Sequence, residues 1–252
     1  MIGGQSQLDI TLWIKRFPGG QTSHGESLPT IVFPHAGGAA AAYRNFALAL
    51  SAKGVDTFVV QYPQRGERLR DPAPDTVAEL AAEMLTAVDW AHLGPLRLFG
   101  HCMGALVGFE FARLAAQRGI VVRELWASAS QAPSTVADSR PAPTTDRELL
   151  ADIADMGGTD ARLLEDEDFL ELLLPAVRAD YHAFNRYTCD RSVRIDADIH
   201  AVGGTSDHRV DQELLRQWEF HTHGVFTFTQ FDGGHFYIDD HLDDVADLVS
   251  CT

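Results

Sequence analysis

Short apolar runs alternate with longer helical stretches along most of the chain. The apolar runs are rich in β-branched residues, as buried strands are, and they fall at residues 30–35, 56–63, 96–100, 122–130, 197–207 and 225–233. The helical stretches fall at residues 39–52, 76–91, 102–119 and 211–220, with a last helix from about residue 239. Repeated strand–helix units of this kind predict an α/β fold with a mostly parallel central sheet flanked by helices.

The alternation stops between residues 131 and 190. This segment begins with Pro, Ser and Thr-rich sequence and continues with acidic helical patterns at residues 146–156 and 166–184, without a strand pattern. We therefore expect a helical lid inserted between two strands of the sheet. A chain of 252 residues still fits one hydrophobic core, so we predict a single domain over residues 1–252.

The balance of charges limits the possible partners. With 36 Asp and Glu against 20 Lys and Arg, the formal net charge is −16, which argues against nucleic acid because phosphate binding needs a basic surface. A protein partner would have to dock on a local basic patch, and Arg65, Arg68 and Arg70 form the densest one. No apolar run approaches the roughly 20 residues of a membrane span, and residues 1–17 do not have the pattern of a secretory signal. We expect a cytoplasmic monomer that does not enter membranes.

Cysteine spacing does not point to a metal or to disulfides. Cys102, Cys189 and Cys251 form no close-spaced ligand pair and no even framework. We therefore expect no metal and no cofactor, and we expect Cys189 and Cys251 to be incidental.

Cys102, in contrast, stands at the centre of a recognisable turn. Gly100 and Gly104 flank it at minus two and plus two, between a predicted strand and a long predicted helix. This is the spacing of a nucleophile elbow, which exposes its central residue at the positive end of a helix. Serine usually occupies that position, so a thiol here is a departure.

A nucleophile of this kind needs a base and an acid, which follow it in the chain. His235 comes after the strand at residues 225–233, and Asp207 ends the strand region at residues 197–207. Both therefore fall at carboxyl ends of strands, where an α/β sheet gathers its site. The competing interpretations are that His101 is the base, although an elbow neighbour normally points away from the nucleophile, or that the acid is one of the residues near His235 in sequence: Asp232, Asp239 and Asp240.

An oxyanion hole would complete the site, because backbone N–H groups stabilise charge that develops on an oxygen. Met103, the residue after the nucleophile, would supply one N–H. Ala36, in the sequence FPHAGG at residues 33–38, would supply the other. The alternative for residues 33–38 is a simple turn.

Several motifs in order resemble the type II thioesterases of nonribosomal peptide and polyketide assembly lines. They are FPHAGG, QYP with the Arg-rich run, FGHCMGA, GTSDHRV and GGHFYI, and the match spans nearly the whole chain. The resemblance implies an α/β-hydrolase fold with a helical lid, and acyl thioesters carried on the phosphopantetheine arm of an acyl or peptidyl carrier protein. It also implies a triad of Cys102, His235 and Asp207, with Ala36 and Met103 as the oxyanion hole.

Two departures from this family concern the nucleophile and the Arg-rich run. Family members usually read GHSMG, and many read YPG where this chain has QYPQRGER, a change that we expect to alter only a surface loop. Cys102 is either the natural residue or a replacement of serine that traps an acyl-enzyme, and both fit the motif.

The thiol leaves three functions open. The leading hypothesis is hydrolysis of acyl or aminoacyl thioesters. The second is transfer of the group between carrier thiols, because exchanging one thioester for another is nearly balanced in free energy. The third is a catalytically silent module that binds acyl carriers. In the lid, we expect most of the apolar side chains at helical spacing to pack on the core and some to line an acyl channel: Phe169, Leu170, Leu172, Leu173, Leu174, Val177, Tyr181 and Phe184.

Overall fold

The computed structural model describes residues 12–19 and 27–251, and the prediction about a secretory signal in residues 1–17 falls mostly on residues outside these ranges. Its sheet has seven strands in the order β1-β3-β2-β4-β5-β6-β7. They are β1 Ile14–Phe17, β2 Thr30–Phe33, β3 Thr57–Val60, β4 Leu96–His101, β5 Val122–Ser128, β6 Asp198–Gly204 and β7 Phe226–Phe231. All neighbouring pairs are parallel except β1 with β3. The predicted, mostly parallel sheet is confirmed, and the antiparallel edge strand β1 was not predicted.

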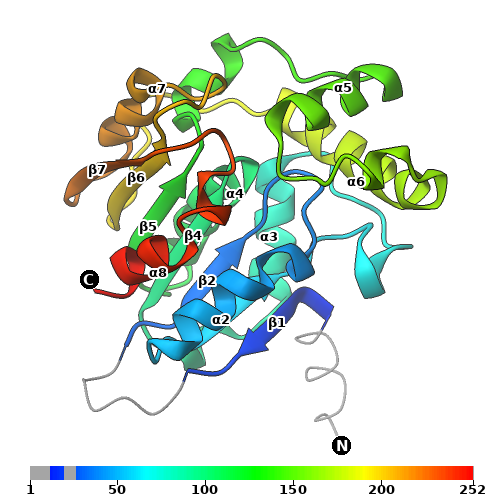
Figure 1. Cartoon of the computed structure of the whole chain (residues 1–252). Helices are drawn as coiled ribbons and strands as arrows, with labels where there is room; N and C mark the ends of the chain where they lie inside the picture. Colours follow the sequence, from blue (N-terminus) through cyan, green and yellow to red (C-terminus); the bar gives the residue numbers. More distant parts are fainter. Residues whose placement is uncertain (1–11, 20–26, 252) are drawn as a thin grey trace, which may run out of the picture.

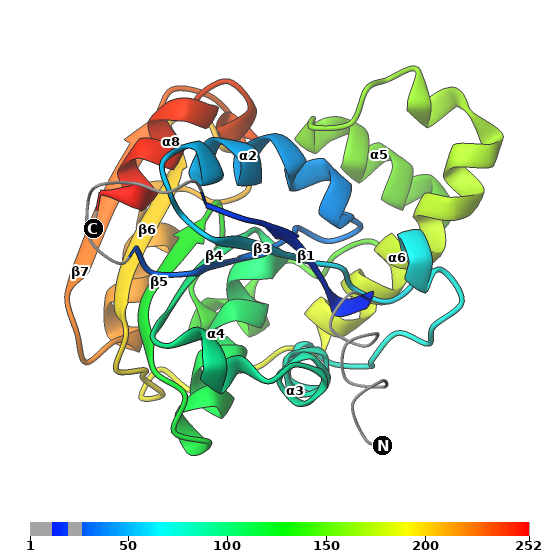
Figure 2. The same ribbon diagram turned by 90° about the horizontal axis from the view of Figure 1, so that it is seen from below.

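Helices cover both faces of the sheet (Figures 1 and 2). Helices α2 and α8 lie on one face, and α3 and α4 lie on the other. Their bounds, with that of the short α7, are α2 Arg44–Ala52, α3 Val77–Ala87, α4 Met103–Gln117, α7 Gln212–Arg216 and α8 Leu242–Ser250. Three-layer packing of this kind matches the predicted arrangement.

The strand pattern divides the core between these two faces. In β2, Ile31 and Phe33 belong to the cluster that contains the buried residues of α3 and α4, while Val32 belongs to the cluster of α2 and α8. Leu98 and Phe99 of β4 divide in the same way. Successive side chains of a strand point to opposite faces, so a strand covered on both faces is apolar throughout. This explains the continuous apolar runs in the sequence.

The segment at residues 131–190 lies between β5 and β6 and contains helices, with no strand among its residues, all of which the structure describes. Its elements are η4 Pro133–Asp138, α5 Asp146–Met156, η5 Leu163–Glu165 and α6 Glu167–Asn185. Leu149 and Ile153 of α5 pack with Val177 and Tyr181 of α6 in a small apolar cluster of their own. We call this segment the helical insertion. In Figure 1 its two α-helices lie together at one end of the sheet.

Of the three arginines of the predicted surface patch, Arg70 is exposed but Arg65 and Arg68 are not. Arg65 and Arg68 are only 5% and 6% exposed. The Arg65 guanidinium pairs with Asp180 of α6, and that of Arg68 pairs with Asp71 and lies 3.6 Å above the ring centroid of Trp13. Acidic and aromatic neighbours therefore stabilise these two cations in the interior. The expectation that QYPQRGER alters only a surface loop is wrong for the same reason.

None of the helices within residues 12–19 and 27–251 combines the length and the apolar character needed to cross a membrane.

Candidate active site

Cys102 lies in a strained turn between β4 and α4. Its backbone has φ 55° and ψ −126°, a combination that a residue with a side chain rarely adopts. The Cys102 N–H donates to the carbonyl oxygen of Ser128 at 2.8 Å, and the Cys102 carbonyl accepts from the N–H of Ala105 at 3.1 Å. These bonds tie the turn to the end of β5 and to the first turn of α4. The geometry is that of a nucleophile elbow.

Backbone atoms approach the two glycines of the elbow so closely that a side chain at either position would collide with them. A Cβ on Gly104 would lie 2.1 Å from the carbonyl oxygen of Phe33, and one on Gly100 would lie 2.4 Å from the backbone nitrogen of Ala105. The first turn of α4 therefore packs directly on the end of β2. This contact brings the loop after β2, which contains Ala36, close to Cys102.

His235 and Asp207 form a buried pair at the ends of two neighbouring strands. Asp207 follows β6, His235 follows β7, and the two strands are paired in parallel. His235 Nδ1 lies 2.8 Å from Asp207 Oδ2, and the residues are 3% and 6% exposed. Asp207 Oδ1 accepts hydrogen bonds from the N–H groups of Arg209 and Val210 at 2.8 and 3.2 Å. Burial opposes ionisation of Asp207, but the His235 ring and these N–H groups lower its pKa below the ordinary value.

Cys102 and His235 line the same pocket. His235 Nε2, the ring nitrogen that is not bonded to Asp207, is buried and has no hydrogen-bond partner among the described residues, and Cys102 is the neighbouring group that acts most strongly on the charge of the ring. Burial alone would lower the pKa of His235, but a negative Cys102 sulfur and the Asp207 carboxylate raise it to about 10. The carboxylate and the nearby sulfur therefore both favour the protonated form of the His235 ring.

The residues that the sequence offered as an alternative base or acid do not take part in the pair formed by His235 and Asp207. His101 is fully buried, its Nδ1 lies 2.9 Å from Ser128 Oγ, and burial lowers its pKa well below the ordinary value. It does not line the pocket that contains Cys102 and His235. Asp232, Asp239 and Asp240 form no hydrogen bond or ion pair with His235 among the residues described, whereas Asp207 does.

Ala36 and Met103 border the same pocket as Cys102. Met103 is the first residue of α4, and Ala36 lies in the loop after β2. Within the described chain, neither backbone N–H is taken up by a hydrogen bond. Two N–H groups next to the sulfur are thus available to an oxygen of a bound molecule.

The pocket has a volume of about 1040 Å³, and much of its wall comes from the helical insertion. Of the eight apolar residues singled out in α6, Tyr181 and Phe184 line it. The sequence analysis did not predict that the residues before α5 and one largely polar face of that helix also line the pocket. These residues are Ser139, Arg140, Pro141, Ala142, Pro143, Thr144, Glu148, Ala151, Asp152, Asp155 and Met156. The amphipathic pattern predicted α5 as a helix, but a polar helical face in a sequence indicates exposure to solvent and not the wall of a pocket.

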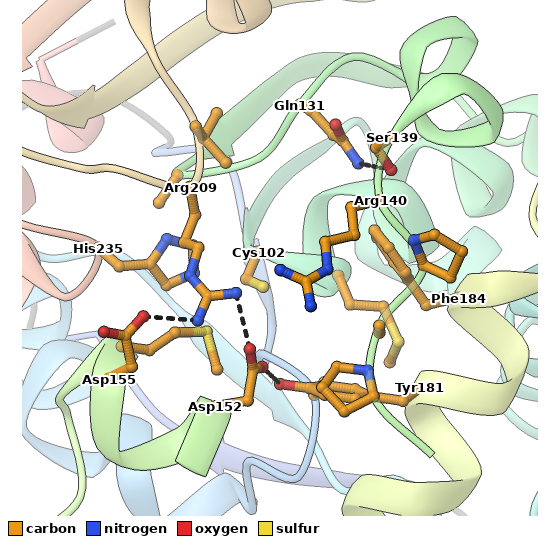
Figure 3. Close-up of a pocket in the computed structure, with 18 of the residues that line it drawn as sticks. Cys102, Gln131, Ser139, Arg140, Asp152, Asp155, Tyr181, Phe184, Arg209 and His235 are labelled. Atoms are coloured by element: carbon orange, nitrogen blue, oxygen red, sulfur yellow. Dashed lines mark hydrogen bonds and ion pairs between the residues drawn. The ribbon is translucent and has the colours of Figure 1, made fainter. Parts of the chain in front are cut away.

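Charged side chains of the pocket are largely paired with one another. Arg209 binds Asp152 and Asp155, each at 2.7 Å, and the Tyr181 hydroxyl donates to Asp152 at 2.7 Å. Figure 3 shows these contacts, with Arg140 among the other side chains that line the pocket. The wall opposite the sulfur is therefore polar as well as apolar.

A strained nucleophile turn and a buried acid–imidazole pair, at the carboxyl ends of parallel strands, define an enzyme of the α/β-hydrolase type. Comparison with known proteins narrows this class. Residues 29–251 match the thioesterase domain family, so the chain belongs to the thioesterase family. The resemblance to type II thioesterases and the α/β-hydrolase fold are thereby confirmed.

Individual relatives agree with this family. The chain is 60% identical over 238 residues to phenyloxazoline synthase MbtB of Mycobacterium tuberculosis, covering 94% of this chain and 16% of that protein, so it spans a small part of that relative. It is 36% identical over 245 residues to thioesterase PikA5 of Streptomyces venezuelae, covering 96% of this chain and 86% of that protein. The solved structure of BorB, the type II thioesterase of the borrelidin biosynthetic cluster, superposes with a TM-score of 0.80 at 34% identity, covering 94% and 96% of the two chains.

Proposed function

We propose that this thioesterase removes acyl or aminoacyl groups from the phosphopantetheine thiol of a carrier protein through an acyl-enzyme on Cys102. The observation that carries the proposal is the buried His235 ring, held by Asp207 at 2.8 Å through Nδ1, in the pocket that Cys102 also lines. A nucleophile, a base and a residue that orients the base are the parts that covalent acyl transfer needs. The relatives named thioesterase PikA5 and type II thioesterase BorB of the borrelidin biosynthetic cluster support the substrate class.

Acylation begins when the Cys102 thiolate attacks the thioester carbonyl carbon. The carbonyl oxygen takes up the electron pair, and the N–H groups of Ala36 and Met103 stabilise it. When the carbonyl re-forms, the bond to the carrier sulfur breaks, and the leaving thiolate takes a proton from the His235 imidazolium. The acyl group is now a thioester of Cys102, and His235 is neutral.

Deacylation uses the neutral ring as the base. His235 removes a proton from a water molecule, whose oxygen attacks the acyl carbon and displaces the Cys102 thiolate. The products are the free acid and the starting thiolate–imidazolium pair. Asp207 stays ionised throughout and stabilises the ring whenever it is charged.

Transfer to a second carrier thiol is the alternative that the cysteine itself favours. In that reaction the thiol of a second carrier replaces water, and one thioester is exchanged for another at little cost in free energy. A silent binding module is the third hypothesis, and it does not explain why the Asp207–His235 pair is buried and aligned on Cys102.

The character of the pocket points to a polar acyl group. Its wall carries Arg140, Glu148, Asp152, Asp155 and Arg209 in addition to apolar side chains. Burying a long alkyl chain against charged groups is unfavourable, whereas an aminoacyl group can form hydrogen bonds with them. We therefore expect aminoacyl and other polar groups to be better substrates than long-chain fatty acyl groups.

The test is an incubation with an aminoacyl carrier protein whose acyl group is labelled, in the presence of a second, unloaded carrier. Free labelled acid without label on the second carrier supports hydrolysis, and the reverse result supports transfer. Neither product, with binding retained, leaves only the silent module. Cys102→Ala is the control that separates enzymatic from spontaneous release.

A further inference from the structure

The loop after β2 is hydrogen-bonded to the helical insertion. The N–H of Gly37, next to Ala36, donates to Oδ2 of Asp180 at 2.7 Å. Asp180 belongs to α6, lies far from Gly37 in sequence and is buried. One carboxylate of the insertion is thus bonded to the backbone of the loop that contains the proposed oxyanion donor.

Arg65 connects the same carboxylate to the other side of the loop. Its Nη2 pairs with Asp180 Oδ2, its Nε donates to the carbonyl oxygen of Gly38 at 3.0 Å, and its Nη1 donates to that of Pro63 at 2.6 Å. Arg65 and Asp180 together therefore bond to the backbone at Gly37 and Gly38. Rotation of the peptide planes that follow Ala36 would break one bond or the other.

Apolar contacts fix the loop against the same helix. Gly37 has φ 77°, and a Cβ there would lie 2.4 Å from Val177 Cγ2 of α6. The Ala36 side chain packs on the cluster formed by α5 and α6. The Gly38 N–H also donates to the His35 carbonyl oxygen within the loop, but the partners of Gly37, polar Asp180 and apolar Val177, both belong to α6. The conformation at Gly37 thus depends on where α6 lies.

A buried ion pair is costly to form, and it contributes little net stability relative to apolar side chains of similar size. Its hydrogen bonds to backbone, however, orient that backbone in a way that apolar contacts cannot. Oxyanion donors act by being held in place before charge develops, and the loss of one donor reduces the rate about 10²–10³-fold.

We propose that Asp180 and Arg65 are positioning residues that hold the Ala36 N–H in its oxyanion-binding orientation only while α6 is seated on the loop. Closure of the insertion then completes the oxyanion hole, so access to the pocket and competence for acyl transfer are coupled. Tyr181 and Phe184 of α6 line the pocket, so a movement of α6 that opens this wall also separates Asp180 from Gly37. The inference rests on the proposed function, in which Ala36 is an oxyanion donor.

Two reactions of Cys102 separate this role from a general structural one. Alkylation by iodoacetamide is displacement at a saturated carbon, so it needs the thiolate and no oxyanion hole. Acylation by a thioester needs both. For Asp180→Ala we expect the single-turnover acylation rate to fall about 10²-fold, with the alkylation rate within about twofold of that of the unchanged protein.

Two further variants show which feature of Asp180 matters. Asp180→Asn keeps an oxygen that can accept from Gly37 N–H, so it should recover part of the acylation rate. Arg178→Ala, on the same helix, removes an exposed ion pair with Asp146 of α5 and no bond to the loop, and both of its rates should match those of the unchanged protein. If Asp180→Ala does not fold, Asp180→Asn and Arg65→Met decide, since both should slow acylation more than alkylation.

The outcomes distinguish the two proposals. Equal acylation rates in the unchanged protein and the Asp180 and Arg65 variants would overturn the positioning role, as would acylation and alkylation rates that fall together. An unchanged protein whose Cys102 is alkylated but never acylated by any thioester would instead overturn the proposed function.

Discussion

Nδ1 of His235 lies 2.8 Å from Oδ2 of Asp207, and both residues are buried at the carboxyl ends of adjacent parallel strands. This contact determines the direction of the imidazole ring, because a ring bonded through Nδ1 presents Nε2 on its opposite side. Cys102 lines the same pocket as His235 and acts on the charge of its ring. A carboxylate distant from the histidine in sequence therefore orients the group that, in the proposed mechanism, exchanges protons with the sulfur.

Replacing Asp207 by Asn should leave the fold intact and remove most of the activity. The amide is nearly the same size but carries no charge to stabilise the imidazolium, and it can hold the ring in the wrong tautomer. We expect kcat to fall about 10²–10⁴-fold with little change in KM. Asp240→Asn is a matched control, because Asp240 is exposed and near His235 in sequence; an equal loss in both variants would contradict the assignment of the acid.

The protonation of His235 can be followed directly by NMR. Its raised pKa means that the ring keeps its proton through neutral pH and loses it near pH 10, rather than near the ordinary value of about 6.5. In Cys102→Ala the negative sulfur is gone while burial remains, so the pKa of His235 should drop markedly. A midpoint near 6.5 in the unchanged protein, or no difference between the two proteins, would show that the sulfur and the ring do not interact.

Gly104→Ala should destabilise the protein strongly. Its Cβ would lie 2.1 and 2.6 Å from the carbonyl oxygens of Phe33 and Pro34, and backbone atoms cannot move aside without disturbing β2. We expect a loss of at least about 2 kcal/mol in the free energy of unfolding, measured by urea denaturation.

Gly108→Ala, one helical turn later in α4, is the control for this substitution. Its Cβ would lie 3.2 Å from the end of the Leu125 side chain and at ordinary contact distances of 3.6 and 3.7 Å from the Phe33 ring, and alanine is the better helix former. Its unfolding free energy should change little. Equal stabilities of the two variants would mean that α4 does not pack on β2 as closely as described.

Replacing Cys102 by Ser should favour hydrolysis of the acyl-enzyme over transfer of the acyl group to a second carrier thiol. An acyl group on serine is an oxygen ester, which is more stable than a thioester, so its return to a carrier thiol is uphill. We therefore expect the ratio of transferred label to free acid to fall in Cys102→Ser. An unchanged ratio would show that the acceptor is selected by the pocket and not by the chemistry of the nucleophile.

Much of the fold was accessible from the sequence because buried parallel strands leave a strong signal. The apolar runs predicted β2 to β7 and the helices between them, and the missing strand pattern at residues 131–190 predicted the helical insertion. The edge strand β1, Ile14–Phe17, escaped because it is short, contains Lys15 and Arg16, and pairs on one side only. Local sequence carries little information about such a strand.

The elbow and its two partners were also within reach, since strand ends gather on one edge of a parallel sheet. The interior position of Arg65 and Arg68 was not, because basic residues are usually exposed and their partners Asp180 and Trp13 lie far away in sequence. The polar pocket wall from α5 escaped for a similar reason. A polar helical face looks the same in sequence whether it borders solvent or a pocket.

The most direct test of the account is to locate the acyl group on the protein. After brief exposure to an aminoacyl carrier protein, the intact mass should increase by one acyl group in place of one hydrogen, and peptide mapping should place it on Cys102. Cys189 and Cys251 are also free thiols, and they provide internal controls. An adduct on either of them, or product formation that continues in Cys102→Ala, would contradict the central claim.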